Sequence, residues 1–449
     1  ADAFFVDTYA VEETFSPMIL KYRKTCRICG NPHLCDVIDL GNQYLQGSFV
    51  KEGVTEPSHR KIPTKLVRCD VTKNENGCGL VQMSVTTPPK ILYSNYWYQS
   101  GVSKTMREHL ADIAGKTMEL IHRGRLYQLL SVCDLACNDG ELLSHFPREM
   151  IRCGIDPSDI ARKAPEKAPG SVIVNDLFPT SRPLPASKFD AVTTIAMFYD
   201  IENPVSFLEA VRTKLKDDGI WIVEVAYLPA TLRQVSFDTV VHEHLMYYSL
   251  STLESVIVAA GLRVFRAETN DINGGSIQVY CSKAECSIHD RQEWTDALNR
   301  IRMEEFDLKL DTEEPYELVR SKCQIVRHEL VKLIRSLRAA GKIIHQYGSS
   351  TKSNTLLQYC GLNHTDIPYA AERAENKWGA RTLGADIEII SEEASRAMAP
   401  DYYLVGPWHF KKEILQREKD AINGDPSAGR KGIKFIFPLP AIEIVEKVP

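Results

Sequence analysis

Short hydrophobic runs alternate along most of this chain with segments that have the periodicity of amphipathic helices. The runs have the length of strands and lie at 132–135, 151–155, 171–174 and 188–195. Apolar residues recur at helical spacing in 103–123 and 203–215. Strands that alternate with helices form a largely parallel sheet with helices on both faces. The pattern therefore predicts an α/β fold for the middle of the chain.

The same alternation returns near the C-terminus, after a long charged helix. Residues 313–340 have the pattern of one amphipathic helix, which tolerates Pro315 only in its first turn. Strand-like runs follow at 342–346, 367–371 and 401–405. The first of these runs ends in a turn of Gly, Ser and Thr that carries Lys352 and precedes a helix, as a phosphate-binding turn does. We expect a second, smaller α/β unit here.

Two pairs of cysteines mark the N-terminal segment. Cys26 and Cys29 form a knuckle in which two thiols share a tight turn, and a more widely spaced pair follows at Cys69 and Cys78. Four thiolates suit a tetrahedral structural zinc, which a small segment rich in loops needs for stability. We therefore predict zinc ligands at these four cysteines, with Cys35 as a spare. Free cysteines in a small β domain are the alternative, and nothing indicates the open position of a catalytic zinc.

The turn after residues 132–135 carries the most specific chemistry of the middle region. Its sequence, Asp134-x-Ala-x-Asn-Asp-Gly140, ends a strand, turns on small and polar residues and starts a helix. The next strand ends in Asp156, 22 residues after Asp134, where α/β nucleotide domains place the acid that holds a ribose diol. The turn lacks the G-x-G-x-x-G of dinucleotide binders. An ordinary βα turn capped by aspartate is the alternative.

Ligands of open α/β sheets bind at the carboxyl ends of the strands. Several small or acidic residues of the middle region fall at these ends. As ligand contacts we predict Asp134, Ala136, Asn138, Asp139, Gly140, Asp156, Asp176, Ala196 and Met197.

Two further stretches are dense in side chains that can take part in chemistry. Residues 93–101 are rich in tyrosine, and they form either an aromatic plug against the N-terminal segment or a hydroxyl-rich wall of a polar pocket. In 236–249, the order His242-Glu-His244 differs from the H-E-x-x-H of zinc proteases. His244 is a candidate general base beside Glu243, and a polar cluster that satisfies buried backbone is the alternative.

Composition sets the class of protein. The 449 residues allow two to four domains, and 44% hydrophobic with 25% charged residues is typical of a soluble globular chain. The net charge of −5 without a long basic run does not favour nucleic acid as a partner. No apolar run reaches the ~20 residues of a membrane span, and the N-terminus lacks the pattern of a secretion signal. Twelve scattered cysteines fit a reducing cytosol, so we expect a cytoplasmic protein.

Taken together, the motifs resemble those of the S-adenosylmethionine-dependent sugar C-methyltransferases of deoxysugar pathways. The resemblance extends over nearly the whole chain, with the motifs in the same order. They are Cys26-x-x-Cys29 with Asp39-Leu-Gly, Asp134-x-Ala-x-Asn-Asp-Gly140, His242-Glu-His244, Gly274-Gly-Ser276 and Tyr347-Gly-Ser-Ser-Thr-Lys-Ser-Asn-Thr-Leu-Leu357.

This resemblance implies three parts. They are a zinc-binding module at 1–90, a Rossmann-like class I methyltransferase domain at 91–295, and a C-terminal α/β Rossmann-like domain with its leading helix at 296–449. The implied cofactors are S-adenosylmethionine and zinc, and the C-terminal domain is expected to help hold a nucleotide-sugar.

The implied activity is C-methylation, commonly at C3 of a nucleoside-diphosphate 4-keto-6-deoxysugar. Carbon beside a ketone is acidic, so a base can remove the C3 proton, and the enolate can then take the methyl group. His244 matches the base of the family and Glu243 its neighbour. Tyr96 and Tyr98 lie in the tyrosine-rich segment of the sugar pocket. The remaining expected residues are Asp200 for catalysis and Asn273, Ser276, Ser350, Lys352 and Asn354 for substrate.

Three positions differ from the pattern of the family, and all of them fall in the expected sugar pocket. Val241 stands where tyrosine is usual, Asp200 where histidine is usual, and Asn273 where histidine precedes Gly-Gly-Ser. These differences leave open the nucleotide, the sugar and its stereochemistry. The oligomeric state also stays open, with a monomer as one possibility. O- or N-methylation of a sugar or small molecule, and a non-catalytic nucleotide-sugar-binding protein, are the competing functions.

Overall fold

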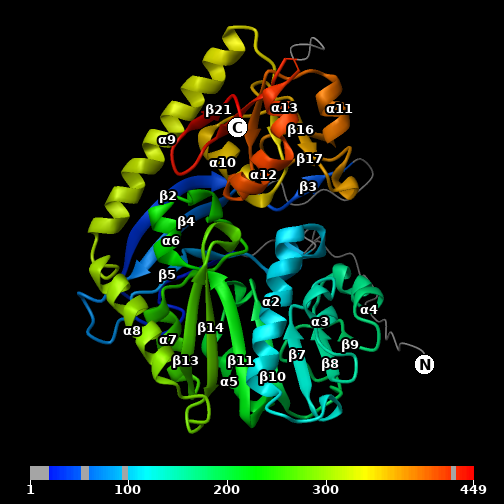
Figure 1. Cartoon of the computed structure of the whole chain (residues 1–449). Coiled ribbons are helices and arrows are strands. Elements are labelled where there is room, and N and C mark those ends of the chain that lie inside the picture. The colour runs from blue at the N-terminus through cyan, green and yellow to red at the C-terminus, as the bar shows by residue number, and fades with distance from the viewer. Residues whose placement is uncertain (1–19, 52–59, 94–99, 426–430) are drawn as a thin grey trace.

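The computed structural model describes residues 20–51, 60–93, 100–425 and 431–449. Three large groups of elements stack along the molecule, with a β-rich N-terminal module at one side between a central and a C-terminal α/β unit (Figure 1). One hydrophobic core, which includes Phe49, Val223 and Phe435, continues through all three, and a second, which includes Ile113 and Tyr280, lies within the central unit.

The N-terminal module is built from short strands around the cysteine knuckle. Its elements are β1 (Lys21–Tyr22), β2 (Leu34–Gln43), β3 (Phe49–Val50), β4 (Ile62–Cys69), β5 (Val81–Met83), β6 (Val85–Thr86) and α1 (Pro89–Tyr93). The main sheet has the order β12-β5-β4-β2, so that a strand from the central unit, β12 (Met246–Tyr247), forms its edge. β12 directly follows the His242-Glu-His244 stretch, which is thereby fixed against this module.

The central unit is a seven-stranded sheet with the order β13-β14-β11-β10-β7-β8-β9. Its strands are β7 (Ser131–Leu135), β8 (Ile151–Ile155), β9 (Val172–Val174), β10 (Phe189–Ile195), β11 (Leu215–Ala226), β13 (Leu262–Asn270) and β14 (Ser276–Lys283). Neighbouring strands from β9 to β11 are parallel, and only β14 runs antiparallel to both of its neighbours. This agrees with the predicted, largely parallel sheet.

Helices cover both faces of this sheet and fill its connections. They are α2 (Lys104–Ile121), α3 (Glu141–Ser144), α4 (Ala164–Lys167), α5 (Pro204–Lys214), α6 (Leu228–Arg233), α7 (Leu250–Ala259) and α8 (Gln292–Asp307). Helix α2 begins after Ser103, whose hydroxyl accepts the Met106 N–H as an N-cap, and it buries its apolar stripe, including Ile113 and Ile121.

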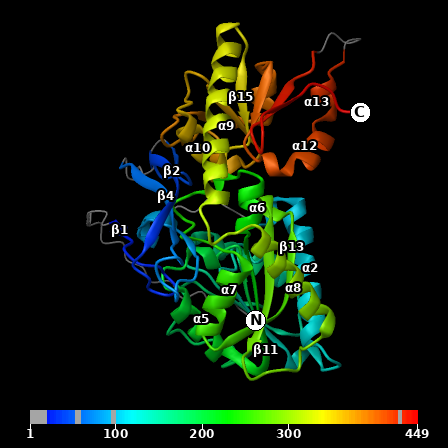
Figure 2. The same ribbon diagram turned by 90° about the vertical axis from the view of Figure 1, so that its left-hand side faces the viewer.

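Helix α9 (Glu314–Ala339) leads from the central unit to the C-terminal unit along one side of the molecule (Figure 2). Its buried residues Cys323, Val326, Leu330 and Ile334 recur at helical spacing, and Pro315 stands in the first turn as predicted. Arg320 also donates to the Val37 carbonyl of β2 at 3.0 Å, so this helix braces the N-terminal module.

The C-terminal unit is an eight-stranded sheet with the order β21-β20-β19-β15-β16-β18-β17-β3. Its own elements are β15 (Ile344–Tyr347), α10 (Thr351–Cys360), β16 (Tyr369–Glu372), β17 (Arg381–Thr382), β18 (Glu388–Ser391), α11 (Glu392–Ala397), β19 (Tyr402–Val405), α12 (Lys411–Arg417), α13 (Lys419–Asn423), β20 (Lys434–Phe437) and β21 (Glu443–Val445). Five strands from β20 to β18 are parallel, and β3 of the N-terminal module closes the far edge. The N-terminal module therefore shares strands with both α/β units.

Candidate functional site

The four predicted zinc ligands converge in the N-terminal module. Among the described residues, Cys26, Cys29, Cys69 and Cys78 form a cluster whose sulfur atoms all lie within 4.8 Å of one another. The Sγ–Sγ distances are 3.4 Å for Cys26 and Cys78 and 3.6 Å for Cys29 and Cys69. Tetrahedral Zn–S bonds of ~2.3 Å would place the sulfur atoms ~3.8 Å apart. The four thiols therefore fit a structural zinc, and Cys35 instead contacts the Arg68 carbonyl.

A cavity of about 350 Å³ lies at the carboxyl ends of the central strands. One wall is the turn after β7, where Ala136, Asn138 and Gly140 all have positive φ. A Cβ at Gly140 would lie 2.8 Å from the Cβ of Ala164, so only glycine fits there. The tight turn brings the backbone of residues 136–138 to the edge of the cavity.

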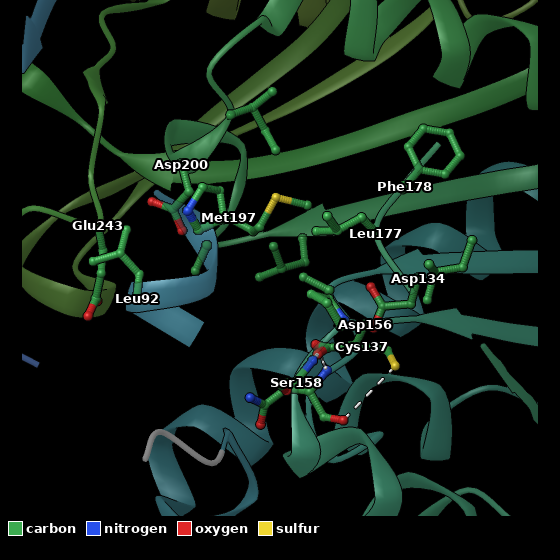
Figure 3. Close-up of a pocket in the computed structure, with 18 of the residues that line it drawn as sticks. Leu92, Asp134, Cys137, Asp156, Ser158, Leu177, Phe178, Met197, Asp200 and Glu243 are labelled. Atoms are coloured by element: carbon green, nitrogen blue, oxygen red, sulfur yellow. Dashed lines mark hydrogen bonds between the residues drawn. The ribbon is translucent and has the colours of Figure 1, made fainter. Parts of the chain in front are cut away.

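Asp156, at the end of β8, is fixed in this wall by hydrogen bonds to both of its carboxylate oxygens. Oδ2 accepts the Asn138 N–H at 2.9 Å, and Oδ1 accepts the Ser158 N–H at 2.7 Å and the Ser158 hydroxyl at 2.6 Å. Asp156 and Ser158 lie side by side in this wall (Figure 3). Oδ1 thereby uses both of its lone pairs, whereas Oδ2 keeps one with which it can accept a hydrogen bond from a ribose hydroxyl.

Burial and neighbouring charge shape the titration of the two strand-end acids. Burial raises the pKa of Asp134 to about 7, and the negative charge of Asp156 adds to this, while the Thr193 hydroxyl, which donates to Asp134 at 2.6 Å, opposes it. Burial also raises the pKa of Asp156. A cation in this cavity would stabilise the ionised form of both carboxylates, so the site favours a positively charged ligand.

The opposite wall comes from the loop after β10 and from the N-terminal module. Ala196, with φ of 55°, turns the chain so that Met197 and Asp200 face the cavity, together with Leu92 of α1 and Glu243 (Figure 3). Lys21, Thr86, Thr87 and Pro89 of the module line the same wall. The central unit and the N-terminal module thus both contribute residues to the lining of the cavity.

Glu243 and His244 occupy the irregular segment before β12. Burial raises the pKa of Glu243 to about 7, which leaves the carboxyl group near half ionisation at neutral pH. Burial lowers the pKa of His244 to about 3, and the Lys352 ammonium lowers it further, so that its imidazole is neutral. The His244 ring packs 4.2 Å from the ring of Tyr199, centroid to centroid. Glu243 lines the cavity itself.

His242 has a different environment from its two neighbours in the sequence. Its Nε2 lies 3.0 Å from the Thr64 hydroxyl and 3.2 Å from the Ile62 carbonyl, both on β4. Burial lowers the pKa of this ring to about 4. His242 therefore anchors the segment to the N-terminal module.

The N-terminus of α10 meets this region from the C-terminal unit. Lys352 donates to the Asn273 carbonyl at 2.6 Å across the two units. Asn273, with φ of 54°, belongs to a short turn before β14. A Cβ at Gly47 would lie 2.3 Å from Glu243 Oε1 and 3.4 Å from Thr351 Oγ1, so Glu243 and the start of α10 face each other across Gly47.

A second cavity, of about 210 Å³, lies at the carboxyl ends of the C-terminal strands. The turn of residues 348–350 and Glu372 at the end of β16 form one side. Lys377 donates to the Ser349 carbonyl at 2.8 Å, and Arg373 and Arg417 also line the cavity. The capping box of Ser350 and Ser353 starts α10 here. The cations and the N-terminus of this helix together suit a phosphate group.

Most of the predicted ligand contacts meet at the first cavity, whereas the predicted substrate contacts are scattered. Asp139 and Gly140 lie outside the lining, and Asp139 instead accepts from Lys167 at 2.7 Å. The predicted residues that line the cavity are Asp134, Ala136, Asn138, Asp156, Asp176, Ala196, Met197, Asp200 and Glu243. Tyr96 and Tyr98 fall outside the described residues.

Of the five predicted substrate contacts, Asn354 and Ser276 are buried. Asn354 donates to the carbonyls of Gln46 and Leu383 at 3.0 and 3.1 Å, which joins α10 to the segment before β3 and to the residue after β17. Ser276 is buried and donates to the Ile272 carbonyl at 3.0 Å. Ser350 lines the second cavity.

Several residues that line the two cavities were not predicted from the sequence. Leu92, Met106 and Leu110 reach the first cavity from helices whose apolar faces read only as core. Glu202 sits in the loop before α5 without a motif around it. Glu372 was visible as an acidic strand end, the same signal that identified Asp156.

Three family models match the chain in succession. A zinc binding domain matches residues 26–93, a methyltransferase domain matches 98–267, and a C-methyltransferase C-terminal domain matches 271–440. The chain is 27% identical over 425 residues to a protein described as C-methyltransferase NovU from Streptomyces niveus, which covers 94% of this chain and 96% of that protein.

Solved structures of methyltransferases are also similar to part of the chain. The mitomycin 7-O-methyltransferase MmcR has a TM-score of 0.33 and 17% identity, over 40% of this chain and 54% of its own. Magnesium protoporphyrin IX methyltransferase (ChlM) from Synechocystis PCC 6803, with bound SAH, has a TM-score of 0.33 and 15% identity, over 41% of this chain and 90% of its own. In the part of the chain that the structure describes, no helix has the length and apolar character to cross a membrane.

Proposed function

We propose that this chain is an S-adenosylmethionine-dependent C-methyltransferase whose substrate is a nucleoside-diphosphate 4-keto-6-deoxysugar. The matches to a zinc binding domain, a methyltransferase domain and a C-methyltransferase C-terminal domain, and the similarity to a C-methyltransferase, support this proposal. Methylation is proposed at C3, next to the ketone. The observation that carries the proposal is the junction at Glu243, where the cofactor cavity meets the N-terminus of α10, which also borders the second cavity.

The cofactor, when bound, supplies an electrophilic methyl group on a sulfonium centre. The residues of the first cavity fit this group, because Asp156 presents a fixed carboxylate to a ribose diol and the other acids favour a positive charge. Leu92, Met106 and Leu110 add apolar side chains to the lining of this cavity, which would limit water around a bound cofactor.

Proton removal is assigned to His244, whose imidazole is neutral and so able to accept a proton, although its lowered pKa makes it a weak base. Glu243 is the second candidate, because it lines the cofactor cavity and its pKa of about 7 suits a base at neutral pH. In both cases the proton at C3 passes to the side chain, and the electron pair stays on the substrate as an enolate.

An enolate oxygen needs a positive or hydrogen-bonding partner. Lys352 is a buried ammonium whose charge reaches His244, and it is held by the Asn273 carbonyl. The hydroxyl of Tyr96 or Tyr98 is a further donor in this proposal. Val241 leaves no hydroxyl at the position where related sequences carry tyrosine.

The second cavity is proposed to hold the nucleotide. The cavity lies at the N-terminus of a ten-residue helix, whose dipole favours an anion, and Arg373 and Lys377 add positive charge. Glu372 accepts the N–H groups of Ser349, Arg373 and Ala374, which leaves its carboxylate ordered beside the cavity for a ribose hydroxyl.

Mass spectrometry of products from a panel of nucleoside-diphosphate 4-keto-6-deoxysugars tests this function. We expect a gain of one methyl group on carbon with at least one member of the panel. Exchange of the C3 proton in deuterated water, measured without cofactor, separates C-methylation from O- or N-methylation, since only the former needs the enolate. Methylation without any C3 exchange would contradict the proposal.

A further inference from the structure

Glu202 joins the cofactor loop of the central unit to the N-terminal module. Its Oε1 accepts from Lys21 at 2.9 Å and from Arg23 at 2.7 Å, and its Oε2 accepts from Arg27 at 3.2 Å and from the Thr86 hydroxyl at 2.6 Å. The four donors belong to the N-terminal module, whereas Glu202 belongs to the loop between β10 and α5. One carboxylate therefore gathers three separate segments of that module.

Arg27 connects this carboxylate to the metal knuckle, because it lies between Cys26 and Cys29. Its guanidinium is fully buried and donates to the Met83 carbonyl at 2.8 Å and to the Thr86 hydroxyl at 2.7 Å. Its backbone N–H donates to Gln82 at 3.0 Å. The conformation of the knuckle thus sets where the guanidinium can meet Glu202.

The same contact lies at the wall of the cofactor cavity. Glu202, Lys21 and Thr86 all line the cavity, and so do Met197 and Asp200 from the loop that carries Glu202. A shift of the N-terminal module away from Glu202 would open this wall. The module therefore completes the cofactor cavity in addition to folding around its own metal.

We propose that Glu202 is a positioning residue that clamps the zinc module over the cofactor cavity, so that zinc and the cofactor bind with positive coupling. Each ligand favours the clamped arrangement, and thermodynamic linkage makes their effects on each other's affinity equal. A merely structural ion pair would change stability without coupling the two sites.

The test compares the zinc-loaded full chain with E202Q, which keeps the shape of the side chain and removes its charge. S-adenosylhomocysteine is the probe of the cofactor cavity, measured by calorimetry, and zinc affinity is measured by competition with a chelator. In the wild type we expect saturating S-adenosylhomocysteine to raise zinc affinity about tenfold, within the ~5–150-fold range usual for coupled sites. E202Q should bind S-adenosylhomocysteine about tenfold more weakly and should lose the effect on zinc.

E268Q is a matched control, since Glu268 also pairs with a lysine and an arginine, Lys116 and Arg266, at a site remote from the cavity. It should keep both affinities and the coupling. Wild-type affinity of E202Q for S-adenosylhomocysteine, or unchanged zinc affinity on adding S-adenosylhomocysteine to the wild type, would overturn the proposal. If E202Q does not fold, T86V is the second variant, because it removes one hydrogen bond to Glu202. It should lower the effect of S-adenosylhomocysteine on zinc affinity from about tenfold to about threefold or less. Full coupling in T86V would then count against the clamp.

Discussion

At the carboxyl edge of the central sheet, Asp156 ends the second strand of a strand–turn–helix unit and accepts the Asn138 N–H of the first turn at 2.9 Å. At the same edge of the C-terminal sheet, Glu372 ends the corresponding strand and accepts the Ser349 N–H of the first turn, also at 2.9 Å. Each acid further accepts the N–H two residues on, at 2.7 Å from Ser158 and 3.0 Å from Ala374. In both units, an acidic side chain at the end of one strand thus holds the turn that follows the neighbouring strand.

The charges around the two edges differ. Of the described residues, one cation, Lys21, lines the first cavity, together with the acids Asp134, Glu141, Asp156, Asp176, Asp200, Glu202 and Glu243. The second is lined by the cations Arg373, Lys377 and Arg417 as well as by the acids Glu372, Glu392 and Glu413. An acidic cavity favours a sulfonium, whereas a mixed cavity at a helix N-terminus favours a phosphate.

The helices that follow the two turns also differ. Helix α3 has four residues and begins with Glu141, whereas α10 has ten residues and begins after a serine capping box. The aligned N–H groups of a longer helix carry a larger partial positive charge at the N-terminus. Under the proposed function, one architecture would serve two ligands, with side chains and helix length, rather than the backbone path, selecting the charge that binds.

The largest effect is expected for the candidate base His244. H244N should bind both ligands and lose turnover by ~10²–10⁴, the usual contribution of a positioned acid–base group. Exchange of the C3 proton should be lost with it. Normal exchange without methylation would remove His244 from this role and leave Glu243, for which E243Q is the parallel variant.

The pH profile of turnover at saturating ligands separates these two bases. Glu243, with its pKa at about 7, accepts a proton only when ionised, so a Glu243-dependent rate rises as pH increases through about 7. His244, with its pKa at about 3, is neutral throughout this range, so a His244-dependent rate stays level.

A smaller effect should distinguish the two acids that end the strands. D156N should weaken S-adenosylhomocysteine binding by ~1.5–3 kcal/mol, the range for hydrogen bonds to charged groups. Nucleotide-sugar binding should be unchanged. D176N, also at the first cavity, is the matched variant and should have the weaker effect. A larger loss in D176N would show that Asp176 holds the ribose.

A modest effect is expected at the second cavity. R373M should weaken nucleotide-sugar binding by up to ~1 kcal/mol, because this side chain is exposed and its charge is screened. The loss should shrink as salt increases. R300M, on the exposed face of α8, should leave both affinities unchanged. Equal losses in the two variants would place the nucleotide elsewhere.

The periodicity of the sequence predicted the two α/β units, their connecting helix and the acids at their strand ends, because these depend on local patterns of apolar residues. It did not predict that β3 joins the C-terminal sheet or that β12 joins the N-terminal one. Both strands have two residues, too short for any periodicity, and their pairing is decided by distant partners.

The same limit applies to the site. Cys26, Cys29 and Asp156 stand in spacings that chemistry requires, so they could be identified in isolation. Asn354 shares a motif with Lys352, yet its amide joins α10 to Gln46 and Leu383. Adjacent residues of a helix point in different directions, and no single sequence states which of them meets the ligand.

The pH dependence of cofactor binding tests the charge difference between the two cavities. Asp134 has a pKa of about 7 because of burial, so it is protonated below that pH and ionised above it. S-adenosylmethionine carries the sulfonium charge and S-adenosylhomocysteine does not, while their other groups are shared. We expect the ratio of their affinities to shift towards S-adenosylmethionine as pH increases from 6 to 8, by up to about tenfold per unit below the pKa. D134N should reduce this shift, and Glu243, whose pKa is also about 7 and which lines the same cavity, should supply the part that remains. The second cavity should show no counterpart. If both ligands follow the same pH curve in the wild type, the acids of the first cavity do not select the cation, and the contrast between the two edges rests on phosphate recognition alone.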